Sequence, residues 1–124
     1  MDGKKWGSKG TLIGGTETGI GTGQNNTTKI VTWLNSYSET DCAAQICDAL
    51  VYGGYSDWFL PSKDELNQMY VNLHLYGIGG FADDTYWSSS EYNAYGTCYQ
   101  YFSNGGQNNT NKNTTLRVRA VRAF

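Results

Sequence analysis

The last third of the chain, residues 86–124, interleaves two kinds of side chain. One kind is stiff and apolar and suits anchoring positions in a sheet: Tyr86, Trp87, Phe102, Val118, Val121 and Phe124. The other is a run of amide, hydroxyl and aromatic side chains between residues 93 and 115. The part of this run in which polar residues are most frequent has low β-propensity. Binding surfaces use Tyr, Asn, Ser and Gly for rigid aromatic contact and adaptable hydrogen bonding. The pattern predicts a rigid scaffold that presents a recognition surface near its C-terminus, and it favours binding over catalysis.

A length of 124 residues predicts one domain with a single core. Sixteen Gly and many Asn, Ser and Thr indicate many turns and little long regular structure. Four Trp, ten Tyr and four Phe supply the burial, because each aromatic ring can remove roughly 150–250 Å² from water. We therefore expect one domain over residues 1–124, with a glycine-rich lead-in over residues 1–25.

Charge is distributed unevenly along a chain whose formal net charge is −2. No Asp or Glu follows Glu91, whereas four cations do: Lys112, Arg117, Arg119 and Arg122. A cationic C-terminal end would favour acidic partners at low salt. The alternative is that the arginines pair with carboxylates elsewhere in the fold, and the sequence leaves both open.

Three cysteines leave at least one thiol unpaired within the chain. Cys42 and Cys47 fall on different faces of one expected helix and could not bridge without breaking it. We expect Cys47 in the core and interpret Cys98 as a small side chain rather than a nucleophile. The sequence has no run of 18 apolar residues and no signal peptide, which predicts no direct membrane insertion. We expect a part of a larger exported protein at a cell or virion surface.

The first half of the chain reads as an irregular segment followed by helices. The glycines before residue 24 could form a phosphate-binding loop, but no Lys-Ser/Thr follows them, so a turn-rich segment over the core is favoured. Asn26 is expected to cap a helix that runs to about Leu34. A second helix is expected to begin after Thr40 or Asp41 and to run to Val51.

A short aromatic strand is expected over residues 55–61, followed by a third helix over residues 62–74. Ser62 and Glu65 have the spacing of a capping box that would open this helix. His74, near its end, is expected to serve the helix dipole or packing rather than catalysis. Asp83 and Asp84 are interpreted as a solvated loop rather than as cation ligands.

Three strands are expected over residues 86–90, 98–102 and 116–124, with the Asn-rich set in the loops between them. Helices first and strands later predict an α+β class with a mostly antiparallel sheet. Tyr99 is expected to point away from Cys98 and Tyr101 and to be a candidate for the core.

Several motifs resemble one bacterial family: GGYSDWFLPSKDELNQMY at residues 53–70, GGFADDTYWSSSEY at 79–92, FSNGGQNNTNKN at 102–113, and VRAVRAF at 118–124. The family is that of the Legionella collagen-like protein C-terminal domain, and the resemblance covers about residues 20–124. It implies a C-type lectin-like fold of the variant shared with formylglycine-generating enzymes. In that fold two or three helices flank a small twisted antiparallel sheet.

The tail is also similar to the variable proteins of diversity-generating retroelements, in which adenine-templated mutagenesis rewrites selected codons. The resemblance implies a variable ligand-binding region over residues 87–124. The candidate ligand-binding residues are Asn93, Tyr95, Gly96, Thr97, Cys98, Tyr101, Asn104, Gly106, Asn108, Asn109, Thr110, Asn111, Asn113, Thr114, Thr115, Leu116 and Arg117.

The calcium-dependent sugar motifs of C-type lectins are absent, and Cys98 lacks the partner cysteine of the formylglycine-generating enzymes. We therefore expect no metal, no cofactor and no catalytic residues, and we interpret Glu91 as a structural hydrogen-bond acceptor. The expected partner is a protein or glycan on another cell or surface, not a nucleic acid. The sequence does not predict an oligomeric state. The alternative that the resemblance implies is an adhesin of fixed specificity for acidic or sulfated polysaccharide; an enzyme and a purely structural module are disfavoured.

Overall fold

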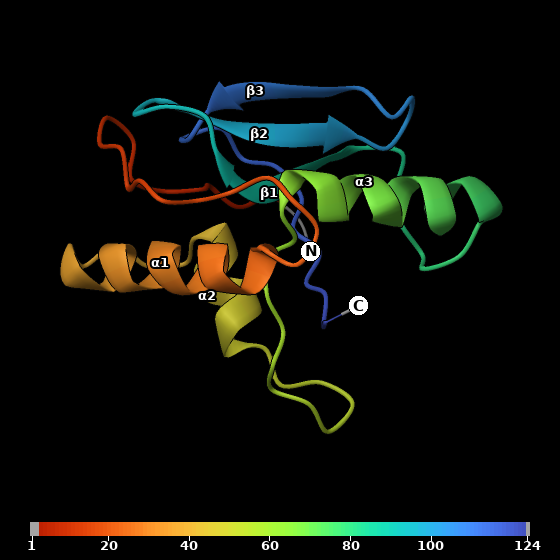
Figure 1. The fold of residues 1–124 in the computed structure, drawn as a ribbon, viewed down its shortest axis with the longest axis horizontal. Coiled ribbons are helices and arrows are strands. Elements are labelled where there is room, and N and C mark those ends of the chain that lie inside the picture. The colour runs from red at the N-terminus through yellow and green to blue at the C-terminus, as the bar shows by residue number, and fades with distance from the viewer. Residues whose placement is uncertain (1–2, 124) are drawn as a thin grey trace.

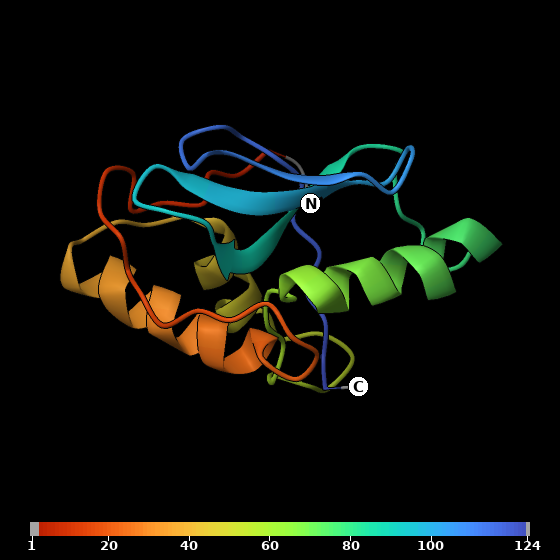
Figure 2. The same ribbon diagram turned by 45° about the horizontal axis from the view of Figure 1, so that its top comes forward.

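The computed structural model describes residues 3–123 and has the expected α+β class. Helices α1 (Gly23–Ser36), α2 (Ala43–Ala49) and α3 (Lys63–Asn72) come first, and the short 3₁₀ helix η1 (His74–Tyr76) follows α3. Strands β1 (Thr85–Glu91), β2 (Gly96–Tyr101) and β3 (Gln107–Asn111) form one antiparallel sheet in the order β1-β2-β3. Figures 1 and 2 show α3 running alongside the sheet and α1 with α2 forming a separate layer below it.

Helix α1 begins three residues earlier than Asn26, so the prediction that Asn26 caps it is wrong. The Asn26 side chain is buried instead, and it binds the backbone of Glu17 twice: Nδ2 donates to the Glu17 carbonyl at 2.7 Å and Oδ1 accepts from the Glu17 N–H at 2.9 Å. An amide can satisfy one donor and one acceptor of a neighbouring segment at once. This pair fixes the irregular lead-in against the start of α1.

Helix α2 is shorter than predicted and begins at Ala43, with Cys42 rather than Thr40 or Asp41 as the N-cap. Cys47 is buried, as expected. The helix ends at Ala49 because Leu50 adopts an extended backbone with ψ of 129°. The chain then enters a tight turn instead of continuing to Val51.

The predicted strand over residues 55–61 is wrong, because this segment forms only isolated bridges, among them Phe59 with Val121. The capping box of α3 is confirmed. The Ser62 N–H donates to Glu65 Oε1 at 2.8 Å, and the Glu65 N–H donates to Ser62 Oγ at 3.3 Å. The box sets the start of α3, whose residues Leu66 and Met69 are buried.

The largest difference from expectation concerns the third strand. Residues 116–124 were expected to form it, but Leu116, Arg117 and Val121 make only isolated bridges. The Asn-rich segment expected as loop contains β3. β3 is held to β2 by hydrogen bonds between backbone groups, which form whatever side chains β3 carries. Polar residues are usual on an edge strand such as β3.

Two apolar clusters hold the layers together. Trp6, Trp87 and Val118 pack with residues of α1 and α2, and Tyr86 with Phe102 packs against α3. Trp87, Phe102 and Val118 are fully buried, which confirms them as anchors, and Val121 is partly buried. The expected anchor Phe124 lies outside the described residues. β1 thus lies between the two clusters and supports β2 and β3.

Candidate ligand-binding surface

The register of β2 and β3 divides their side chains between two faces. Tyr99 lies opposite Asn108 and Thr97 opposite Thr110. Directly opposed residues share a face, and successive residues alternate. We call the first set, with Tyr101, the outer face: Thr97, Tyr99, Tyr101, Asn108 and Thr110. The inner face carries Cys98, Gln100, Gln107, Asn109 and Asn111.

The outer face presents an aromatic pair beside an amide. The rings of Tyr99 and Tyr101 lie 5.3 Å apart between centroids, edge to face at 89°. The prediction that the Tyr99 and Tyr101 side chains point in opposite directions is therefore wrong. Side chains alternate between the two faces of a strand, so residues two positions apart lie on the same face. Burial raises the pKa of the Tyr99 phenol, and its hydrogen bond to Tyr101 raises it further. Tyr99 is half-buried against the core, whereas Tyr101 and Asn108 are exposed.

The inner face holds the same chemical types in a fixed arrangement. The fully buried Gln100 donates to Asn67 Oδ1 of α3 at 2.9 Å and to the Gly105 carbonyl at 3.1 Å. Gln107 donates to the Lys63 carbonyl at 2.9 Å. These amides attach the sheet to α3 and are not free to meet a ligand.

Several asparagines in the predicted set hold turns. Asn93 Oδ1 accepts from the N–H groups of Tyr95 at 2.9 Å and Gly96 at 2.7 Å. Asn104 accepts from Gly106 N–H, and Asn111 accepts from Asn113 N–H, both at 2.8 Å. Asn side chains stabilise turns in this way. Local turn geometry therefore explains part of the Asn-rich composition, in agreement with the many turns that the composition indicated.

The structure does not bring all predicted site residues onto one surface. Gly96, Thr97 and Cys98 are buried, and Thr97 Oγ1 donates to the Ser90 carbonyl at 2.9 Å. Thr110, Leu116 and Arg117 are partly buried. The exposed members are Asn93, Tyr95, Tyr101, Asn104, Gly106, Asn108, Asn109, Asn111, Asn113, Thr114 and Thr115. They are distributed over the outer face, the edge strand β3 and the three turns that flank these strands.

Lys112 was expected to contribute to a cationic surface, and the structure contradicts this. Its ammonium group is fully buried and lies 2.6 Å from Glu91 Oε2, 2.9 Å from Ser8 Oγ and 3.1 Å from the Thr11 carbonyl. Burial lowers the pKa of Lys112, and the contact with Glu91 opposes that shift. A buried charge needs a partner, and Glu91 provides it.

Glu91 has a structural role, as predicted. Besides Lys112, its carboxylate accepts from the N–H groups of Ile13 at 2.8 Å and Gly14 at 2.9 Å. We call Lys112, Glu91 and the segment at residues 8–14 the clamp. It ties the glycine-rich lead-in to the end of β1 and to the residue after β3.

Two of the C-terminal arginines pair with carboxylates, which is the alternative that the sequence left open. Arg117 binds Asp84 at 2.9 Å, and Arg122 binds Asp57 at 2.6 Å. Hydrogen bonds from these arginines lower the pKa values of Asp84 and Asp57. Much of the expected positive charge is therefore neutralised.

His74 and the three cysteines are packed against or bonded to other parts of the fold. His74 lies 5.3 Å from the Phe102 ring and binds Asp83 at 2.8 Å, in agreement with a packing role. All three cysteines are free and buried, and burial raises the pKa of Cys42 to about 11 and that of Cys47 to about 12. Over residues 3–123 no group of three His, Cys, Asp or Glu side chains is arranged to hold a metal ion. No described helix is long and apolar enough to cross a membrane.

These features define a small α+β domain with a polar and aromatic strand surface over a rigid aromatic core. A family model for the Lcl C-terminal domain matches residues 6–122, and the chain belongs to this family, as the motifs suggested. No curated protein matches the chain.

Proposed function

We propose that this domain is a non-catalytic ligand-binding domain whose recognition surface is centred on the outer face. The observation that carries the proposal is the Tyr99–Tyr101 pair, which lies beside Asn108 on two hydrogen-bonded strands. Tyr offers a large contact area at low conformational-entropy cost, and an amide offers both a donor and an acceptor. We expect Tyr101, Asn108 and Thr110 to contact the ligand, with exposed turn residues such as Tyr95 and Asn113 at the rim.

The separation of anchors from presented side chains supports a finer proposal. Trp87 lies directly opposite Tyr99 across the β1–β2 ladder, on the same face of the sheet, and is fully buried, so it anchors the strand next to the outer face in the core. Exposed residues can then change at little cost in stability. We propose that the domain is a diversified variable protein of a diversity-generating retroelement with a C-type lectin-like fold. It would act at a cell or virion surface as part of a larger exported protein.

The ligand that we propose is a protein or a largely neutral glycan on another cell or surface. An acidic or sulfated polysaccharide is the alternative ligand. The burial of Lys112 and the ion pairs of Arg117 and Arg122 argue against this alternative, because paired cations attract an anionic polymer weakly. Strong loss of binding with added salt would favour the alternative.

The test is deep sequencing of the 3′ end of the gene across the source population, with a search for a nearby near-identical repeat. We expect substitutions at Tyr101, Asn108 and Thr110, at positions matched to adenines in the repeat. The buried residues Trp87 and Phe102 should stay constant. A uniform tail without a repeat would contradict diversification, and substitutions spread equally over buried positions would contradict the proposed surface.

A further inference from the structure

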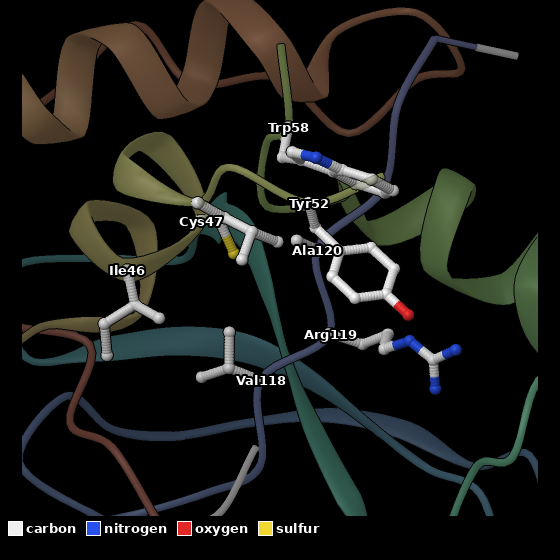
Figure 3. A pocket seen from close by; sticks show the side chains of 8 residues that line it. Ile46, Cys47, Tyr52, Trp58, Val118, Arg119 and Ala120 are labelled. Atoms are coloured by element: carbon white, nitrogen blue, oxygen red, sulfur yellow. The ribbon is translucent and has the colours of Figure 1, made fainter. Parts of the chain in front are cut away.

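A pocket with a volume of about 240 Å³ lies away from the outer face, between α2, the segment at residues 50–58 and the segment at residues 118–120. Its lining is aliphatic on one side and aromatic on the other: Ile46, Cys47, Leu50, Val118 and Ala120, with Tyr52, Trp58 and Arg119. Figure 3 shows Ile46 and Val118 on one side of the space, with the Tyr52 ring and Arg119 on the other and Trp58 above.

We call Tyr52 and Trp58 the aromatic wall of the pocket, and it is held in place although Tyr52 is largely exposed. Tyr52 and Tyr55 exchange two backbone hydrogen bonds of 3.0 Å around Gly53 and Gly54, whose φ angles are +62° and +83°. Only glycine takes up two successive positive φ angles easily, so these residues form a tight hairpin turn. The Trp58 indole N–H donates to the Tyr55 carbonyl at 3.1 Å, and its ring meets Tyr52 edge to face at 6.3 Å.

Arg122 supports this hairpin from outside the pocket. Its guanidinium lies 3.4 Å from the Tyr55 ring centroid and is bound to Asp57 through Nε at 2.6 Å and Nη2 at 3.1 Å. The wall is thus preformed, yet Tyr52 remains 70% exposed. An aromatic side chain held rigidly in water is a feature of binding sites.

Arg119 supplies the charge of the pocket. Unlike Arg117 and Arg122, it makes no ion pair with any described carboxylate. Its guanidinium carbon lies 4.3 Å from the Phe81 ring centroid, a contact that orients the group without bringing a carboxylate of residues 3–123 to it. Arg119 lines the pocket, with its guanidinium at the rim beside Phe81. A guanidinium at the rim of an apolar cavity is suited to a carboxylate, which it can bind through two parallel hydrogen bonds.

We propose that this pocket binds a small monocarboxylate that carries one ring-sized or branched apolar group. A cavity of roughly 150 Å³ lined by apolar side chains holds one benzene molecule, so about 240 Å³ accommodates one ring and a short chain. The aliphatic floor offers few partners to a polyhydroxylated sugar, which would lose hydrogen bonds to water there. The apolar group lies between Val118 and Tyr52, and the carboxylate meets Arg119. The site shares no residue with the outer face and does not depend on the function proposed for it.

The experiment is a titration of the whole chain, followed by NMR or calorimetry, with phenylacetate and with the neutral phenylacetamide as probes. We expect saturable phenylacetate binding with a Kd on the order of 1 mM. Arg119→Gln should weaken phenylacetate about tenfold and leave phenylacetamide unchanged, because a charge-assisted hydrogen bond is lost. The control is Lys9→Gln, which removes the same unit of charge from an exposed residue that does not line the pocket. It should change the affinity for neither phenylacetate nor phenylacetamide.

Tyr52→Ala provides an independent variant that removes the wall without disturbing the core, since Tyr52 is exposed. It should weaken both probes at least fivefold, with the far-ultraviolet circular dichroism spectrum unchanged. An absence of saturable phenylacetate binding up to roughly 10 mM would overturn the proposal. Equal affinity of wild type and Arg119→Gln for phenylacetate would overturn it as well, and so would full affinity in Tyr52→Ala.

Discussion

The two faces of β2 and β3 carry similar side chains in different surroundings. Gln107 and Asn108 are neighbours with the same amide group, yet Gln107 is bound to the Lys63 carbonyl of α3 and Asn108 is exposed to solvent. Tyr86 and Tyr101 differ in the same way, since one is buried under α3 and the other is exposed. The difference teaches that residue type does not separate structural from presented positions in this domain. What separates them is whether another part of the chain packs over the individual side chain.

The largest effect is expected at the clamp that closes the lead-in over the sheet. Lys112→Ala leaves the Glu91 carboxylate buried without its cation, and should lower the free energy of unfolding by about 3–5 kcal/mol. Urea denaturation followed by tryptophan fluorescence measures this change. The matched control is Lys5→Ala, because Lys5 is partly exposed and lies 3.9 Å from Glu39, and it should cost under about 1 kcal/mol. Equal effects of the two variants would contradict the clamp.

An intermediate effect is expected on the inner face. Gln100→Ala leaves Asn67 and the Gly105 carbonyl without their buried donor, and should cost about 1–3 kcal/mol in unfolding free energy. Asn108→Ala, on the adjacent strand but the outer face, should cost less than about 0.5 kcal/mol. Thermal denaturation of both variants under one buffer condition compares them directly. The distinction between the faces fails if Asn108→Ala is the more damaging change.

A smaller effect is expected at the turn between β1 and β2. Asn93→Ala removes the acceptor of two backbone N–H groups, and should cost about 1 kcal/mol. Asn93→Asp keeps an acceptor oxygen and should restore most of the loss in chemical denaturation. If Asn93→Ala proves neutral, Asn93 has no structural role and belongs with the presented residues.

The smallest effect is expected on the outer face itself. Asn108→Tyr and Thr110→Asn should each change the free energy of unfolding by less than about 0.5 kcal/mol, because neither side chain is buried in a cluster. Differential scanning calorimetry provides the measurement. A loss above about 2 kcal/mol in either variant would show that the outer face cannot accept the diversity proposed for it.

Features with local causes were predictable from the sequence. The capping box at Ser62 and Glu65 involves residues three apart, so its spacing predicts the start of α3 without knowledge of the rest of the fold. The anchors Trp87, Phe102 and Val118 are buried because large apolar side chains gain most from leaving water. The family assignment followed from motifs of this kind and is confirmed over residues 6–122.

Features with distant causes were missed. β3 was expected as a loop because its side chains have low β-propensity, but its ladder is made by the backbone of β2. Lys112 was counted with the cations of the C-terminal end because no carboxylate follows Glu91 in the sequence, and its partners Ser8 and Thr11 lie about one hundred positions earlier in the chain. Among the contacts of Lys112, only Glu91 could have been suspected from the sequence, because it is the last carboxylate in the chain and precedes Lys112.

The sequence by itself determined the class, the family, the third helix and the aromatic anchors, since each depends on residue type or on short spacing. The tertiary structure alone decided which glutamines attach the sheet to α3 and which cations are buried or paired. The physical reason is that an amide or a charge finds its lowest free energy through the partner it meets, and in this fold many of those partners come from remote segments.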